Sequence, residues 1–322
     1  MNNDQQVIQE RFGTRRIIKN AQKVVEYIFD GLIEKGEQWI ISGAPKAGKS
    51  RLALQLALCA SEGNDFLGYK CHRKQRVLYI DLELSPRLSA SRIYEFYNRN
   101  SVALLSNSHL FMCNDYKQID VNSTSDCGKV QEIISSINPD LIIWDVLARM
   151  HSADENSNIA MAQVMQNVRR LSRGAAHVIV HHARKENFGN PGAKSMRGAS
   201  SIHGEADGVM SLAFECSKKG SHSLVFSTRA IETPEKLWLT SESLAFVKSA
   251  FKAEDSKELL SDLFKKAFGS EKVMRKTELI ENIESETKLG KRQIERNIDG
   301  LVKNGLLRKT KSGREVLFEI QF

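Results

Sequence analysis

The sequence predicts an α/β fold built on a mostly parallel sheet and followed by a second, much smaller domain. Over most of the chain, short apolar runs alternate with amphipathic stretches, which is the pattern of consecutive strand–helix units. A glycine-rich segment joins one such strand to the helix that follows it. Near the C-terminus the apolar residues recur at helical spacing instead, which predicts a separate helical domain there.

The bulk composition is that of a globular protein, with 41% hydrophobic and 27% charged residues in a chain of 322. No apolar run approaches the roughly 20 residues that a membrane helix needs, and Met1–Arg11 has no leader-like apolar segment. The 5 cysteines are scattered and never in CxxC spacing, which argues against disulfides or a zinc site and for a reducing compartment. We therefore expect a cytoplasmic protein. A net charge of +8 is compatible with a nucleic-acid partner without requiring one.

The larger domain is expected to span residues 28–250, after an N-terminal extension at residues 1–27. Its last strands adjoin without an intervening helix, which predicts an antiparallel hairpin around Lys218–Ser221, and Leu237–Val247 is expected to form a further strand pair. In chain order, the predicted strands are Gln38–Ser42, Val77–Asp81, Leu110–Cys113, Leu141–Asp145, His177–His181, Gly208–Phe214 and Ser223–Thr228. The predicted helices are Lys49–Ser61, Ser89–Tyr97, Ser125–Ile137 and Ile159–Gly174.

The smaller domain is expected to be a winged helix-turn-helix domain at residues 257–322, joined by a linker at residues 251–256. Gly269 and Gly305 are expected to end its first and third helices, and the tail is expected to form a hairpin that turns at Lys311–Gly313. Three helices followed by a hairpin is the winged-helix order. Apolar residues recur at helical spacing in Leu259–Phe268, Lys276–Glu286 and Lys291–Lys303.

The glycine-rich segment matches the phosphate-binding loop (P-loop) pattern G-x-x-x-x-G-K-S in full, between a predicted strand and a predicted helix. Backbone N–H groups of such a loop surround a β-phosphate, and the helix N-terminus adds partial positive charge. Lys49 is expected to reach the β- and γ-phosphates, and the Ser50 hydroxyl to ligate Mg²⁺. The pattern predicts a site for ATP and Mg²⁺ formed by Gly43, Ala44, Pro45, Lys46, Ala47, Gly48, Lys49, Ser50 and Arg51.

Two further strands end in carboxylates. In a parallel sheet the carboxyl ends of the strands face the ligand crevice, so Glu83 is expected to polarise the attacking water, while Asp81 has a structural role. Asp145 ends an apolar run and is expected to hold Mg²⁺ through water, completing a metal site with Ser50. Val146, not a second acid, follows Asp145, which favours a base on the other strand. Arg87 and Arg92 follow Glu83, and the sequence leaves open whether either lies near the nucleotide or on the surface.

A pair of histidines ends another strand at the same edge. His182 is the expected sensor of the γ-phosphate, since the alternation of a strand turns His181 to the other face; a buried structural histidine is the alternative. The segment Ala183–Ser201 that follows has little to bury, and loops of this length are usually functional or disordered. Lys185, Lys194 and Arg197 make this loop basic, which favours contact with a nucleic-acid backbone over a merely solvated loop.

The segments GAPKAGKS, LYIDLELS, LIIWDVLARMHSADENSN, VIVHHARK and MRGASSIHGEAD resemble the RepA-like hexameric helicases of the RecA/DnaB superfamily, with an AAA_25-like P-loop ATPase core. The resemblance spans about Ile28–Ser227. It implies a RecA-like core in a hexameric ring, with ATP at the subunit interfaces and with Lys49, Ser50, Glu83, Asp145 and His182 in the nucleotide site.

The same resemblance implies that Arg197 is an arginine finger that reaches the γ-phosphate held by a neighbouring subunit. It also implies that two loops line a central channel for single-stranded DNA. These loops are Ala148–Asn158, with Arg149, and Ala183–Met196, with Lys185 and Lys194. A winged helix is not part of the minimal helicase.

Cations are concentrated between Leu289 and Arg314. Because Ile294 and Ile298 turn inward, Lys291, Arg292 and Arg296 fall on the exposed face of the third helix. With Lys311 in the wing, this face is expected to contact duplex DNA. A protein-interaction domain whose basic face is only solvated is the alternative.

These features together predict an ATP-hydrolysing, DNA-binding oligomeric motor, a replicative or mobile-element helicase of the RepA type. A RecA/RadA-like recombination or repair ATPase that binds DNA without unwinding it is the second hypothesis. The third is a DNA-binding regulator that acts through the winged helix, with ATP as its switch.

Overall fold

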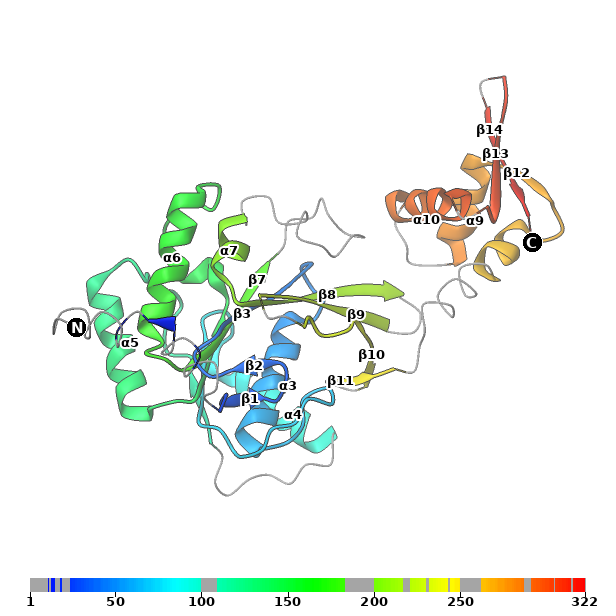
Figure 1. Ribbon diagram of the computed structural model, residues 1–322. Coiled ribbons are helices and arrows are strands. Elements are labelled where there is room, and N and C mark those ends of the chain that lie inside the picture. Colours follow the sequence, from blue (N-terminus) through cyan, green and yellow to red (C-terminus); the bar gives the residue numbers. More distant parts are fainter. Residues whose placement is uncertain are drawn as a thin grey trace.

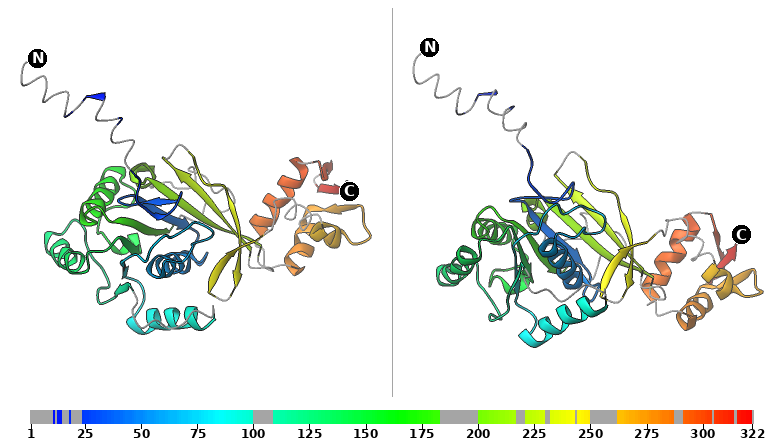
Figure 2. Two further views of the ribbon diagram at one scale, coloured as in Figure 1. Left: turned by 60° about the horizontal axis from the view of Figure 1, so that its bottom comes forward. Right: turned by 90° about the horizontal axis from the view of Figure 1, so that it is seen from below.

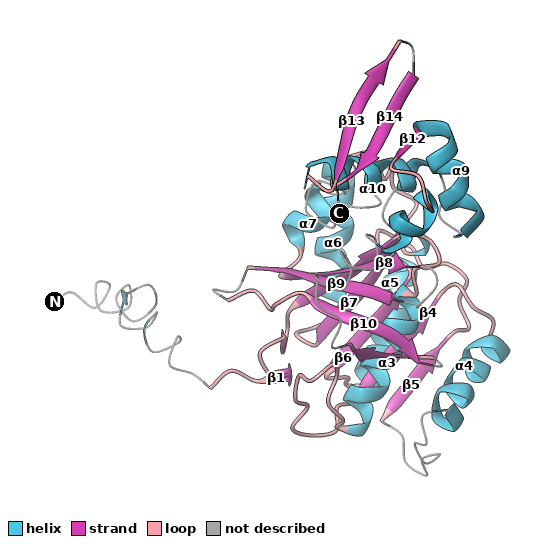
Figure 3. Ribbon diagram, turned by 90° about the vertical axis from the view of Figure 1, so that its right-hand side faces the viewer, coloured by secondary structure: helices cyan, strands magenta, loops and turns pink. Residues whose placement is uncertain are grey.

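The computed structural model has one large mixed sheet with helices on both faces, and a small sheet with its own helices near the C-terminus (Figures 1 and 3). The structure describes residues 24–99, 109–182, 200–216, 221–229, 232–242, 244–249, 262–286, 291–303, 305–313 and 315–321, together with residues 11, 13, 14 and 18.

Within these residues, the large sheet has nine strands in the order β11-β10-β9-β8-β3-β7-β6-β4-β5. The parallel strands are β3 (Gln38–Gly43), β4 (Val77–Asp81), β5 (Leu110–Cys113), β6 (Leu141–Asp145), β7 (Ala176–His182) and β8 (Gly208–Cys216). Antiparallel strands β9 (Ser221–Thr228), β10 (Leu237–Glu242) and β11 (Ala245–Lys248) extend the sheet beyond β8. The mostly parallel α/β sheet expected from the sequence is therefore present.

Helices cover both faces of this sheet, so residues on either side of each central strand are buried (Figure 2). Ile143 and Val178 face the apolar layer that contains α3 (Lys49–Glu62) and the end of α4 (Pro86–Arg99). Ile142 and Ile179 face the opposite layer, with α5 (Thr124–Ile137) and α6 (Asn158–Leu171). Burial on both faces explains why these strands are continuous apolar runs rather than alternating ones.

Several elements differ from the sequence-based expectation. The helix expected at Ser89 begins at Pro86, because Ser85 accepts hydrogen bonds from the backbone N–H groups of Leu88 and Ser89, and proline is tolerated in a first turn. Ser200 and Ser201, expected in a loop, begin the short helix α7 (Ser200–Glu205), in which Ile202 is buried.

Short elements near the N-terminus and after β6 were not expected. Strands β1 (Tyr27–Phe29) and β2 (Ile33–Glu34) pair antiparallel, and both are too short to give a periodic pattern. The extension assigned to residues 1–27 therefore overlaps β1 by its last residue. The 3₁₀ helix η1 (Leu147–Arg149) follows β6.

The C-terminal part has an apolar core of its own, which includes Phe264, Leu279, Ile283, Ile298 and Phe318. Its described elements are a helix at residues 262–268, β12 (Val273–Arg275), α9 (Lys276–Glu286), α10 (Lys291–Lys303), β13 (Leu307–Ser312) and β14 (Glu315–Ile320). The strands form an antiparallel sheet in the order β12-β14-β13. Strand β12 was not expected, and the expected linker at residues 251–256 lies outside the described residues. Among the helices that the structure describes, none is long and apolar enough to cross a membrane.

Candidate active site

The strand order brings the polar strand ends together at one edge of the sheet. Strands β3, β7, β6 and β4 are consecutive neighbours and all run parallel. Their carboxyl ends carry the P-loop, the two histidines, Asp145 and the segment with Glu83. Strand β7, which carries the histidines, lies between the strand before the P-loop and the strand that ends in Asp145.

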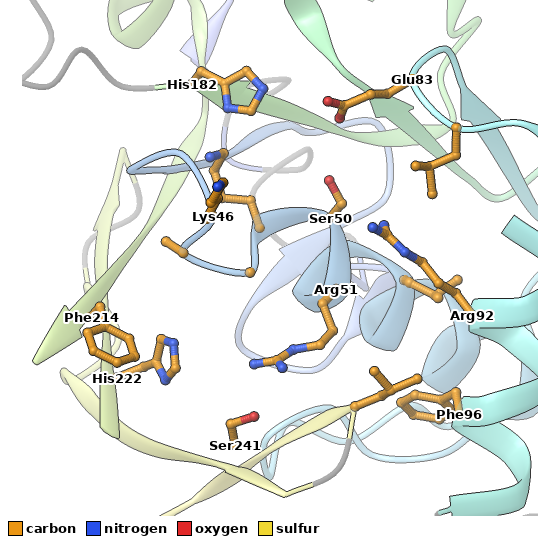
Figure 4. A pocket seen from close by; sticks show the side chains of 16 residues that line it. Lys46, Ser50, Arg51, Glu83, Arg92, Phe96, His182, Phe214, His222 and Ser241 are labelled. Atoms are coloured by element: carbon orange, nitrogen blue, oxygen red, sulfur yellow. The ribbon is translucent and has the colours of Figure 1, made fainter. Parts of the chain in front are cut away.

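A cavity of about 640 Å³ opens at this edge (Figure 4). The predicted residues Lys46–Arg51, Glu83 and His182 all line it, whereas Gly43, Ala44 and Pro45 complete the loop without lining the cavity. Its lining consists of Lys46, Ala47, Gly48, Lys49, Ser50, Arg51, Leu54, Glu83, Leu84, Arg92, Phe96, His182, Phe214, His222, Ser241 and Leu244.

Two glycines are required by the path of the loop. A Cβ at Gly43 would overlap the carbonyl oxygen of Leu212 on the neighbouring strand. Gly48 has a φ of 95°, and a Cβ there would lie 2.9 Å from Cζ of Phe246. Only glycine adopts this φ readily and also fits beside Phe246. Without a Cβ at these positions, the N–H groups of the loop are not covered by side chains.

Lys49 is buried beneath this loop, and its Nζ donates a hydrogen bond to the carbonyl oxygen of Ala44 at 2.8 Å. Burial lowers the pKa of Lys49 to about 8, although the nearby carboxylates of Asp145 and Glu83 oppose the shift. The ammonium is thus held by the loop itself, at the position from which a P-loop lysine contacts phosphates.

Asp145 lies beside the loop and receives a hydrogen bond on each of its oxygens. The Ser50 hydroxyl donates to Oδ1 at 3.1 Å, and the Tyr79 hydroxyl donates to Oδ2 at 2.6 Å. Burial raises the pKa of Asp145 to about 6, and the two hydrogen bonds oppose that rise. A hydroxyl and a carboxylate so placed are the hard oxygen donors that Mg²⁺ prefers.

Asp81 shapes the segment that presents Glu83. Its buried carboxylate accepts hydrogen bonds from the backbone N–H groups of Glu83 at 3.1 Å and Leu84 at 2.9 Å, and from the Ser89 hydroxyl at 2.6 Å. These bonds engage both carboxylate oxygens of Asp81 within the fold. Glu83 is exposed to the cavity, where a carboxylate can accept a proton from water.

The two histidines differ in their surroundings. His182 lines the cavity and pairs in register with Gly43, whereas His181 pairs with Ser42 and lies outside the lining. Burial lowers the pKa of His181 to about 4, and burial together with Lys49 lowers the pKa of His182. Both imidazoles are therefore neutral near pH 7, and a neutral imidazole has one donor and one acceptor nitrogen.

Apart from Arg51, the far end of the cavity is formed by side chains that the sequence did not single out. The Phe214 and His222 rings stack edge to face with centroids 4.9 Å apart, and His222 and Phe246 do so at 5.0 Å. The Arg51 guanidinium lies 4.1 Å from the centre of the Phe246 ring. This end carries aromatic rings and the Arg51 guanidinium, and the P-loop end carries Lys46 and Lys49. Of the two arginines left open by the sequence, Arg92 lines the cavity and Arg87 does not.

Comparison with known proteins bears on this site. A family model described as an AAA domain (AAA_25) matches residues 9–187, which is more than half of the chain. The chain belongs to this AAA domain family. It is a P-loop ATPase with a core of the RecA/DnaB type.

Among solved structures, this AAA domain protein is similar to the KaiC-like protein PH0186 from the hyperthermophilic archaeon Pyrococcus horikoshii OT3, with 13% sequence identity and a TM-score of 0.47. The match covers 70% of this chain and 99% of that chain. The comparison with curated proteins found no match.

P-loop ATPases use ATP and Mg²⁺, and the residues of this AAA domain fit both. The P-loop forms the cradle, Gly48 lines it without a side chain, and Lys46 and Lys49 bring positive charge to it. Ser50 and Asp145 supply oxygen donors next to that cradle. These residues are the ones that would hold the triphosphate and its metal.

Other residues that the sequence assigned to function lie away from this site or beyond the described part. Arg149 is exposed on η1 and does not line the cavity. Lys291 is exposed on α10. Lys185, Lys194 and Arg197, and the side chains of Arg292, Arg296 and Lys311, lie outside the described residues.

Proposed function

We propose that the protein is an ATP-hydrolysing, DNA-binding motor that works as a cytoplasmic ring-shaped oligomer, a replicative or mobile-element helicase of the RepA type. One observation carries the hydrolytic part. A single cavity joins the P-loop to Glu83 and His182, with Asp145 hydrogen-bonded to Ser50 at 3.1 Å.

Each group has a role that its position supports. Lys49 holds the β- and γ-phosphates by exchanging its bond with the Ala44 carbonyl for phosphate oxygens. Ser50 and Asp145 hold Mg²⁺, which when bound neutralises charge on the phosphate oxygens. Glu83 orients the attacking water and accepts its proton. His182 donates a hydrogen bond to the γ-phosphate and loses it when that phosphate leaves.

The aromatic end of the cavity suits the nucleobase. Phe214 is 49% exposed, so one face of its ring is free to stack on a base, while the buried His222 supports it from behind. Arg51 bridges this end and the P-loop, since its backbone follows Ser50 and its guanidinium lies over Phe246. A nucleoside triphosphate has the same polarity, with an aromatic base at one end and anionic phosphates at the other.

The oligomeric part of the proposal rests on the resemblance to RepA-like helicases. In a ring, Arg197 reaches the γ-phosphate held by the neighbouring subunit. We expect Arg197→Ala to lose ATPase activity and to regain it in mixed rings with Lys49→Ala subunits, which supply the arginine. Mixed rings that stay inactive would contradict a finger acting between subunits.

The DNA-binding part rests on charge. The chain carries a net charge of +8, Arg149 is exposed after β6, and Lys291, Arg308 and Lys309 are exposed in the C-terminal part. We propose that the core, through Arg149, Lys185 and Lys194, binds single-stranded DNA. Residues 257–322, as a winged-helix domain, bind duplex DNA through Lys291, Arg292, Arg296 and Lys311.

The hydrolytic proposal is tested by Glu83→Gln, which keeps the shape of the side chain and removes the base. We expect turnover to fall by about 100-fold or more while binding of a fluorescent ATP analogue is retained. Glu132→Gln, at an exposed position of α5 outside the cavity, is the control and should hydrolyse ATP normally. Normal hydrolysis by Glu83→Gln would remove Glu83 as the base.

The DNA-related proposal is tested by measuring the ATPase rate with single-stranded and with duplex DNA, together with strand displacement. A helicase displaces strands and is stimulated by single strands. Stimulation without displacement would favour the recombination or repair ATPase. Sequence-specific duplex binding that survives Lys49→Ala would favour the regulator.

A further inference from the structure

Tyr79 is a buried residue of β4 whose hydroxyl reaches the nucleotide site from the apolar core. It is 3% exposed, and its ring packs in the apolar layer between the sheet and α3. At the tip of this otherwise apolar side chain, the hydroxyl donates to Oδ2 of Asp145 at 2.6 Å and lies 3.5 Å from the backbone oxygen of Ser50. One phenol thus touches both residues that the proposed function assigns to the metal.

The strand register explains why a tyrosine is needed at this position. Tyr79 pairs with Ile143 across β4 and β6, while Asp145 pairs with Asp81. The hydroxyl that bonds Asp145 therefore comes from a residue two positions before Asp81, the register partner of Asp145. This is a displacement of about 6.6 Å along the strand. A serine or threonine is too short to span it, and a phenylalanine spans it without a donor.

The hydrogen bonds divide the two oxygens of Asp145 between different partners. Oδ1 faces the Ser50 hydroxyl, and Oδ2 is occupied by Tyr79. The backbone beside them is also held, since the N–H of Leu82 donates to the carbonyl oxygen of Asp145 at 2.7 Å. With Tyr79 in place, rotation of the carboxylate would break a short, buried hydrogen bond, which is costly.

We propose that Tyr79 is a positioning residue of the metal site, which fixes the carboxylate of Asp145 so that Oδ1, beside Ser50, is the oxygen presented to Mg²⁺. The inference rests on the proposed function, because it assigns Mg²⁺ to Ser50 and Asp145. Hydrogen bonds to ligating carboxylates orient them and strengthen metal binding.

Another tyrosine in the same domain provides a matched control. Tyr97 on α4 is 5% exposed, and its hydroxyl donates to the carboxylate of Glu62 at 3.4 Å. Neither residue of this pair lines the cavity. Tyr79→Phe and Tyr97→Phe each remove one hydroxyl that bonds a carboxylate, and only the first touches the metal site.

The experiment measures how strongly each full-length variant depends on Mg²⁺. Binding of a fluorescent ATP analogue is titrated with Mg²⁺ at fixed nucleotide and repeated in EDTA, and Mn²⁺ binding is followed by electron paramagnetic resonance. For Tyr79→Phe we expect the Mg²⁺ and Mn²⁺ concentrations for half-saturation to rise about 10-fold, with unchanged nucleotide affinity in EDTA. Tyr97→Phe should match the wild type in every titration. Wild-type metal dependence in Tyr79→Phe would overturn the proposal.

A double variant tests whether Tyr79 acts through Asp145. In an Asp145→Asn background, adding Tyr79→Phe should change the metal dependence by less than about 2-fold; a further 10-fold loss would overturn the proposal. Thermal unfolding without metal identifies a folding defect, because a merely structural hydroxyl would lower the stability and leave the metal titrations unchanged. If the wild type binds Mg²⁺ and nucleotide but does not hydrolyse ATP, the proposed function is refuted. The binding titrations still test the role of Tyr79 in that case.

Discussion

The side-chain amide of Gln55 makes two hydrogen bonds with the backbone of Phe246, both 2.8 Å long and both buried. Gln55 lies in α3, the helix that follows the P-loop, and Phe246 lies in β11, the edge strand of the large sheet. At Phe246 the amide thus makes the two backbone hydrogen bonds that a further strand would make with this edge. It also holds the Phe246 ring against Gly48 and under Arg51.

Gln55→Ala leaves the N–H and the carbonyl of Phe246 without these partners. Because each of these two unpaired buried groups costs about 1–3 kcal/mol, we expect the free energy of unfolding to fall by about 2–6 kcal/mol. The measurement is urea denaturation followed by circular dichroism. Gln163→Ala, which removes an exposed glutamine that bonds Asn167 on α6, is the control and should stay within about 0.5 kcal/mol of the wild type. If both variants lost the same free energy of unfolding, the hydrogen bonds to Phe246 would stabilise the fold no more than an exposed glutamine does.

Phe214→Ala tests the aromatic end of the cavity. If the exposed ring stacks on the nucleobase, its loss should raise the KM for ATP about 5- to 10-fold with little change in kcat, since such contacts contribute about 1 kcal/mol. Inhibition by tripolyphosphate, which has no base, should be unaffected. Tyr94→Ala removes an equally exposed ring, 56% accessible on α4, that does not line the cavity, and should leave KM unchanged. If tripolyphosphate binding weakened to the same extent, Phe214 would instead contribute to the stability of the P-loop.

The depressed pKa of Lys49 makes nucleotide binding sensitive to alkaline pH. Triphosphate binds the protonated ammonium, and the pKa of Lys49 in the free protein is about 8. Above that value each pH unit lowers the protonated fraction about 10-fold, so the affinity for a fluorescent ATP analogue should fall markedly between pH 8 and 9. In Lys49→Arg the guanidinium stays charged, and the decline over this range should disappear. Identical pH profiles in both proteins would show that another group titrates.

The sequence predicts the central strands well because of how they are buried. Val77–Asp81 and Leu141–Asp145 have the bounds expected, since a strand covered on both faces is a continuous apolar run that ends where the chain reaches the polar edge. The P-loop pattern is equally local, because the glycines, the lysine and the hydroxyl act within one turn. Short strands such as β1 and β12 give no periodic pattern and were missed.

The rest of the site depends on which strands become neighbours, and a single sequence does not determine that. Phe214, His222 and Ser241 come from β8, β9 and β10, and they reach the cavity because the sheet continues past the P-loop strand β3. Tyr79 has the pattern of a core residue in the sequence. Its hydroxyl acquires a role only through the register that places Asp145 two residues further along the neighbouring strand.

A buried histidine at the opposite end of β7 should make stability depend on pH. His177 is 1% exposed, with Nε2 at 2.8 Å from Oε1 of Gln38. Burial lowers its pKa from 6.5 to about 4, although the Ala175 carbonyl at Nδ1 opposes the shift. Between these two values the unfolded chain binds a proton that the folded protein excludes, so stability rises with pH and is lost as the pH falls from 6.5 toward 4.

From this shift we expect His177 to account for a loss on the order of 3 kcal/mol over that interval. Urea midpoints at several pH values should fall less steeply for His177→Gln than for the wild type, even where the variant is less stable at pH 7.5. His181, whose pKa is also about 4, adds a slope of the same sign, whereas the raised pKa of Asp145 adds one of the opposite sign, so His177 is measured by the difference between the wild-type and variant slopes. A His177→Gln slope equal to that of the wild type would mean that His177 is protonated in the folded protein, with Gln38 and Ala175 as its two acceptors.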